Sequence, residues 1–113
     1  VDAYVIPIPK RKLKAYVEMA KLGKRTWMKH GALDYYECVA DDLTSWGQGY
    51  AKMAKLKPGE TLVVAFVVYK SRAHRDRVNA KVMKEFAEAD VPMDMPFDVK
   101  RMANGGFTVI VGS

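Results

Sequence analysis

The chain has 113 residues, half of them apolar, which is the size and composition of one domain with its own core and excludes a disordered chain. Its net charge of +6 permits attraction to nucleic acid, anionic lipid or acidic small molecules without selecting among them. A single cysteine excludes a disulfide scaffold, no apolar run is long enough to span a membrane, and we expect a cytoplasmic protein.

The N-terminal third of the chain predicts one strand followed by one long helix. Residues 3–8 favour a strand, and Pro7 and Pro9 are expected to end it because neither can donate a ladder hydrogen bond. Apolar side chains then recur at helical spacing over residues 10–30, where a histidine and a glycine close the helix. The side chains expected on its apolar stripe are Leu13, Tyr16, Val17, Ala20, Lys24, Trp27 and Met28.

Residues 33–40 alternate in the manner of a half-buried strand. One face carries Leu33, Tyr35, Glu37 and Val39, and the other carries Asp34, Tyr36, Cys38 and Ala40. Glu37 therefore shares its face with apolar neighbours. The glycines and the Lys-Pro-Gly turn of residues 41–59 predict a long excursion, in which residues 50–56 could form a short extra strand.

The third predicted strand, residues 61–69, is apolar at almost every position, so both of its faces must be buried. Two helices of the predicted length can cover one face of a small sheet. The other face needs a second layer, most simply the same sheet of another copy of the chain. This strand therefore predicts a homodimer.

The C-terminal part predicts a second helix and a last strand. Ser71 can cap a helix that runs to about residue 89, residues 90–98 should be irregular, and residues 107–111 favour a strand. The side chains expected to face the core from this helix are Val78, Val82, Phe86 and Ala89. The order βαββαβ predicts a ferredoxin-like α+β sandwich with both helices on one side, in a single domain over residues 1–113.

Several motifs resemble those of the YbaA-like family of uncharacterised bacterial proteins, in the dimeric α+β barrel superfamily. The motifs lie at residues 30–33, 37–42, 69–76, 78–83, 95–98, 100–102 and 105–107. The resemblance implies a homodimer in which two sheets pack face to face. The family has no established activity, and the superfamily includes cofactor-independent monooxygenases, haem-degrading enzymes and small-ligand isomerases, so enzyme chemistry follows from the fold by analogy alone.

Glu37 and Tyr35 are the first candidates for catalysis, with His30 as a third. An apolar setting favours the protonated form of a carboxyl, which suits proton transfer, and Arg101 could be the partner of Glu37. The alternatives are a structural ion pair or an edge strand on which Glu37 reaches water. Cys38 has no evident base partner and is expected to be a buried filler of the core.

Other residues are candidates for binding a ligand. Trp27 and His30 lie three apart, so an aromatic ligand could stack beside them, although core packing and a histidine at the helix C-terminus explain them as well. Arg72, His74 and Arg75 stand where a helix begins and could hold an anion, or form a solvated basic face. Arg101 is the last of the residues that are candidates for binding a ligand. We expect no metal, because the ligand spacing is absent, and no cofactor.

The sequence leaves three functions open. The first is binding of a small organic or anionic ligand in a pocket between helices and sheet, and the second is a cofactor-independent, monooxygenase-like enzyme. The third is RNA binding, because an RNA-recognition motif has the same order of elements and residues 65–69 resemble part of its third strand. The apolar character of that strand suits a partner sheet better than stacked bases, so nucleic acid is the weakest of the three.

Overall fold

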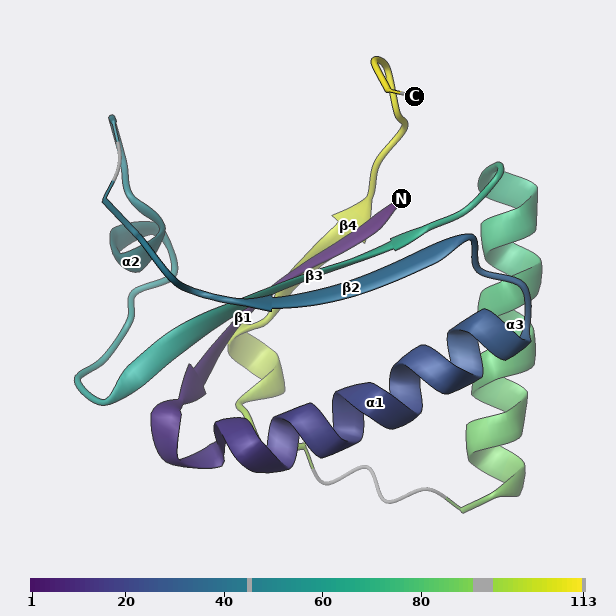
Figure 1. The fold of residues 1–113 in the computed structure, drawn as a ribbon, viewed down its shortest axis with the longest axis horizontal. Helices are drawn as coiled ribbons and strands as arrows, with labels where there is room; N and C mark the ends of the chain where they lie inside the picture. The colour runs from purple at the N-terminus through teal and green to yellow at the C-terminus, as the bar shows by residue number, and fades with distance from the viewer. Residues whose placement is uncertain (45, 91–94, 113) are drawn as a thin grey trace.

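The computed structural model describes residues 1–44, 46–90 and 95–112, which form an α+β fold with one four-stranded sheet (Figure 1). The strands are β1 (Asp2–Pro9), β2 (Asp34–Val39), β3 (Glu60–Val68) and β4 (Ala103–Gly106). The helices are α1 (Leu13–Lys29), α2 (Tyr50–Met53) and α3 (Arg72–Glu88), and single 3₁₀ turns lie at η1 (Lys10–Lys12) and η2 (Val99–Arg101). No helix of these described residues is both long and apolar enough to cross a membrane.

The sheet has the strand order β2-β3-β1-β4, and every neighbouring pair is antiparallel. Pro7 does not end β1 as expected, because the strand continues to Pro9. The pairing with β4 stops at Val5, so β1 is an edge strand at Pro7. A missing N–H is tolerated at such an edge.

The two long helices lie on one face of the sheet, and α3 stands across the end of α1 (Figure 1). Alternate residues of β3, namely Val63, Ala65 and Val67, are buried. Val63 packs with Tyr16 of α1 in one core cluster, and Val67 packs with residues of α3 in a second. The predicted βαββαβ order is therefore present, with both helices needed to cover this face.

The opposite face of the sheet is free of long helices, and we call it the open face. The register of the strands assigns its residues, since side chains alternate between faces. They are Ala3, Val5, Pro7 and Pro9 of β1, Asp34, Tyr36 and Cys38 of β2, Glu60, Leu62, Val64, Phe66 and Val68 of β3, and Ala103 and Gly105 of β4. The charged residues among them are Asp34 and Glu60, and Glu60 is paired with Arg101. Pro7 and Leu62 are buried, so the chain itself covers the face around them.

The buried face of helix α1 differs slightly from the apolar stripe that the sequence predicted. Its buried residues are Tyr16, Ala20, Gly23 and Thr26. Val17 is 41% exposed, and Lys24 and Met28 are exposed as well, so the prediction placed these three wrongly. The reason is that small residues, Ala20 and Gly23, bring α1 close to the sheet, and the larger apolar side chains beside them extend over its rim.

Two strand predictions are wrong. Residues 50–56 contain the one-turn helix α2. The last strand is Ala103–Gly106, earlier than the predicted residues 107–111, because β4 pairs with β1 and reaches its end when Gly106 meets Asp2. The N–H of Phe107 still donates to Val1 O at 2.7 Å, and Phe107, Val109, Ile110 and Val111 are exposed.

Helix α3 agrees with its prediction. The Ser71 side chain accepts a hydrogen bond from His74 N at 3.1 Å, as an N-cap should. Val78 and Val82 are buried in the core, whereas Ala89 is exposed just past the last turn.

Candidate ligand cavity

A cavity of about 610 Å³ lies between α1, α3 and the helix-covered face of the sheet. This volume is in the range of pockets that enclose small organic molecules. Aromatic side chains dominate its wall, and the largest of them are Tyr4, Tyr16, Trp27, Tyr35, Phe86 and Phe97.

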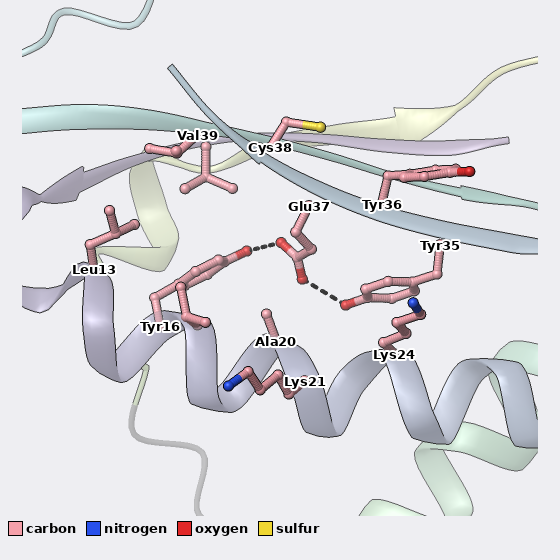
Figure 2. Close-up of a pocket in the computed structure, with 12 residues that line it drawn as sticks. Leu13, Tyr16, Ala20, Lys21, Lys24, Tyr35, Tyr36, Glu37, Cys38 and Val39 are labelled. Carbon is pink, nitrogen blue, oxygen red and sulfur yellow. Dashed lines mark hydrogen bonds between the residues drawn. The ribbon is translucent and has the colours of Figure 1, made fainter. Parts of the chain in front are cut away.

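Glu37 is the polar centre of the cavity wall. β2 directs Glu37 and Tyr35 toward α1, and α1 directs Tyr16 toward β2 (Figure 2). Tyr35 Oη donates to Glu37 Oε2 at 2.7 Å, and Tyr16 Oη donates to Glu37 Oε1. Both carboxylate oxygens are therefore hydrogen-bonded, and we call these three residues the Tyr-Glu-Tyr triad.

The electrostatics of the triad keep both tyrosines in the neutral form. Burial raises the pKa of Tyr16, and its hydrogen bond to the Glu37 carboxylate raises it further. The pKa of Tyr35 is raised by the same two causes in the same order. Both hydroxyls consequently stay protonated over the physiological range and act as donors to Glu37.

The triad also borders a second hollow, a groove of about 350 Å³ between α1 and the edge strand β2 (Figure 2). Tyr16, Tyr35 and Glu37 line both hollows, so the triad forms part of the wall between the outer groove and the inner cavity. Lys21 and Lys24 of α1 line the outer groove alone. A ligand in the cavity would thus meet Glu37 from the side opposite to these lysines.

Trp27 is held at the other end of the cavity by a buried polar network. Its Nε1 donates to Asn79 Oδ1 at 3.0 Å, and Tyr69 Oη donates to the same oxygen at 2.9 Å. Asn79 Nδ2 in turn donates to Asp2 Oδ2 at 3.2 Å, and Arg75 Nε donates to Asp2 Oδ1 at 2.9 Å. Because every member has a partner, the network fixes the Trp27 ring as a rigid part of the wall.

Two predicted site residues lie away from the cavity. Arg101 does not meet Glu37; it forms a two-pronged ion pair with Glu60, at 2.6 and 2.9 Å, which lowers the pKa of Glu60 to about 2. His30 Nε2 lies 2.9 Å from Glu85 Oε1 on α3, so it joins the two helices. The proposed pairing of Arg101 with Glu37 was wrong because η2 places the arginine beside the start of β3.

The predicted anion site at the start of α3 is assembled, but its groups already have partners. Arg75 contacts Asp2 and Asp76, and Arg72 lies 3.7 Å from Asp76. His74 Nδ1 accepts a hydrogen bond from Lys70 N at 2.9 Å. Anion binding at these residues stays a prediction.

Cys38 is exposed on the open face, so the expectation of a buried filler was wrong. The alternation of β2 placed it correctly on the face opposite to Glu37.

Sequence reasoning missed three residues of the site. Tyr16 was recognised as apolar, but its hydroxyl became relevant only when the fold brought it to Glu37 across 21 positions. Asn79 gave no signal, because a lone asparagine in a helix is usually solvated. Gly23 could have been found from its place on the buried stripe of α1, where a glycine lowers helix stability and so requires a reason.

The close approach of Gly23 to Tyr35 gives a testable prediction. A Cβ at position 23 would lie 2.7 Å from Tyr35 Oη. Gly23→Ala should therefore lower the free energy of unfolding by about 1–2 kcal/mol, even though alanine gains about 1 kcal/mol in helix propensity. In the Tyr35→Phe background, where the hydroxyl is gone, the same change should be neutral or stabilising. Urea unfolding of the four proteins measures this difference, and equal effects in both backgrounds would contradict it.

Comparison with known proteins places this chain in an uncharacterised family. The family model described as "Protein of unknown function (DUF1428)" matches residues 1–99. The chain is 36% identical over 112 residues to the uncharacterised protein YbaA of Escherichia coli K12. The matched region covers 98% of this chain and 96% of the relative. The same values hold for YbaA of Escherichia coli O157:H7 and of Shigella flexneri. The resemblance predicted from the sequence motifs is confirmed, and the relatives are bacterial.

Proposed function

We propose that this chain, which belongs to the DUF1428 family of proteins of unknown function, binds a small organic molecule in the cavity between α1, α3 and the sheet. The observation that carries the proposal is the combination of a largely apolar cavity of about 610 Å³ with a few polar groups in its wall, above all the Glu37 carboxylate that two tyrosine hydroxyls hold in place. Ligand sites typically join a large apolar surface to a few fixed polar groups that orient the ligand.

A matched pair of variants on α3 tests this proposal. Both alanines are exposed, but Ala87 lines the cavity and Ala80 lies on the same helix outside it. The neutral dye N-phenyl-1-naphthylamine should bind to the parent protein with enhanced fluorescence. Ala87→Phe should weaken that binding about tenfold or more by occupying the space, and Ala80→Phe should leave it unchanged. Equal dye binding by both variants, or none by the parent, would contradict the proposal.

Catalysis by a monooxygenase-like enzyme is the second candidate. It requires an enclosed pocket that reaches Trp27, Tyr35 or Glu37. All three residues line the cavity, whereas Met83, Ala87 and Asp90 of its wall are exposed. Glu37 keeps lone pairs beyond those used by the two tyrosines, so it could accept a proton from a bound substrate. Turnover that is lost in Glu37→Gln would support this candidate.

A homodimer of ferredoxin-like subunits, forming a dimeric α+β barrel, is the assembly that we propose. The strand order β2-β3-β1-β4 with antiparallel neighbours supports the ferredoxin-like arrangement. The open face supports the dimer, since its strands carry only two charged residues, Asp34 and Glu60, of which Glu60 is paired with Arg101. Tyr36 and Phe66 pack together on this face with ring centroids 5.1 Å apart. A sheet face of this composition is better buried against a second copy than left in water.

The composition of the open face argues against RNA binding. An RNA-binding sheet needs exposed aromatic rings together with basic side chains that neutralise phosphates. The register places no lysine or arginine on this face in the four strands. The aromatic pair of Tyr36 and Phe66 therefore fits a subunit interface better than a platform for bases.

A further inference from the structure

The charges around the cavity differ in sign from the charge of the whole chain. The chain carries a net charge of +6, yet Glu37 and Asp90 are the charged residues among the described residues that line the cavity. Two carboxylates disfavour an anionic ligand at short range, where the charge of distant surface lysines is screened by salt.

Glu37 also lacks the basic partner that other shielded carboxylates have. Asp2 pairs with Arg75, Glu60 with Arg101, and Glu85 with Lys29 and His30. Over residues 1–44, 46–90 and 95–112, no lysine, arginine or histidine forms an ion pair with Glu37. Its two oxygens instead accept hydrogen bonds from the neutral hydroxyls of Tyr16 and Tyr35. A shielded carboxylate without a cation is one that a positively charged ligand would stabilise.

The aromatic wall supplies the second requirement of a cation site. Trp27 and Tyr35 lie with ring centroids 6.0 Å apart, tilted by 40°, and Trp27 meets Phe86 edge to face at 5.8 Å. The faces of such rings attract organic cations, and the attraction grows when water is excluded. Around Glu37 the cavity therefore combines an anionic group with aromatic surfaces, as sites for organic ammonium ions do.

We propose that the ligand of this cavity is an organic cation, an amine or quaternary ammonium joined to an apolar or aromatic body, with its charge beside Glu37 and its body against Trp27 and Phe86. This proposal rests on the proposed function, since it names the ligand class of the same cavity. The two phenol hydroxyls orient the carboxylate, which leaves its remaining lone pairs for N–H donors or for a direct contact with a methylated ammonium.

Three probes of similar size and different charge test the proposal by displacement of N-phenyl-1-naphthylamine from the full-length protein. They are phenethylamine, 2-phenylethanol and 3-phenylpropanoate. The amine should displace the dye at a concentration about tenfold lower than the alcohol, and the carboxylate should be the weakest of the three. In Glu37→Gln the preference for the amine over the alcohol should fall to about twofold or less, while the alcohol itself is little affected.

Glu88→Gln is the matched control, because it removes the same charge from an exposed position at the end of α3 outside the cavity wall. It should preserve the preference for the amine. Displacement by the alcohol or the carboxylate as effective as displacement by the amine would overturn the inference and leave the proposed function intact. An amine preference that persists in Glu37→Gln would also overturn it. A protein that binds neither the dye nor any probe would instead refute the proposed function itself.

Discussion

Glu37→Leu is expected to lower the free energy of unfolding by about 2–4 kcal/mol, although leucine is apolar and of similar size. The reason is that Tyr16, only 4% exposed, and Tyr35 would each lose the acceptor of their hydroxyl proton. An unsatisfied buried donor costs more than the hydrogen bond itself contributed. Urea unfolding, followed by circular dichroism, measures the loss.

The matched control for this prediction removes the orphaned hydroxyls as well. Adding Tyr16→Phe and Tyr35→Phe to Glu37→Leu should recover most of the lost stability, because an apolar triad leaves no polar group unpaired. A triple variant that is no more stable than Glu37→Leu would show that the stability is lost because leucine does not fit the space at position 37. The hydrogen bonds of the triad would then contribute little. Recovery would mean that the polar triad is retained for binding or chemistry, since stability does not require it.

A charge on the open face is expected to turn the proposed dimer into a monomer. Phe66 lies on the open face of β3, where Phe66→Glu would place one unpaired carboxylate from each subunit inside the interface. Such a burial should weaken association about 100-fold or more. Sedimentation velocity at about 20 µM should give twice the chain mass of 12.7 kDa for the parent and close to that mass for the variant.

Met28→Glu adds the same charge on α1, on the helix-covered side, where Met28 is already 38% exposed. It should sediment as the parent does. A parent protein that is monomeric at this concentration would contradict the dimer, as would a Phe66→Glu variant that still sediments at twice the chain mass. Loss of the dimer in both variants would indicate that an added charge destabilises the protein in general, and that the open face is not the interface.

The sequence predicted the elements better than it predicted their ends. Period-two spacing located β2, a continuous apolar run located β3, and helical spacing located both long helices, because those patterns report which side chains face a core. The last strand was misplaced to residues 107–111, since β propensity cannot indicate where β1 runs out of residues to pair. The apolar stripe predicted for α1 wrongly included Val17 for a related reason. Only the packed structure shows that Ala20 and Gly23 are buried on the face of α1 that meets the sheet.

The candidate site was predicted in part. Alternation along β2 put Glu37 and Tyr35 on the covered face, and helical spacing put Trp27 near them. Arg101 was assigned to the wrong carboxylate, because charge alone does not distinguish Glu37 from Glu60 when each is separated from the arginine by more than 40 positions. The third member of the triad, Tyr16, followed only from the structure.

By itself, the sequence determined the order of the four strands and the two long helices, and the family, since local periodicity and motifs carry that information. The face of the sheet on which each strand residue lies followed from the register of the strands. The tertiary structure decided which polar groups meet and where space remains. Those features depend on the distance and angle at which α1 and α3 cross the sheet. That geometry arises from contacts between residues far apart in the chain, and no local pattern records it.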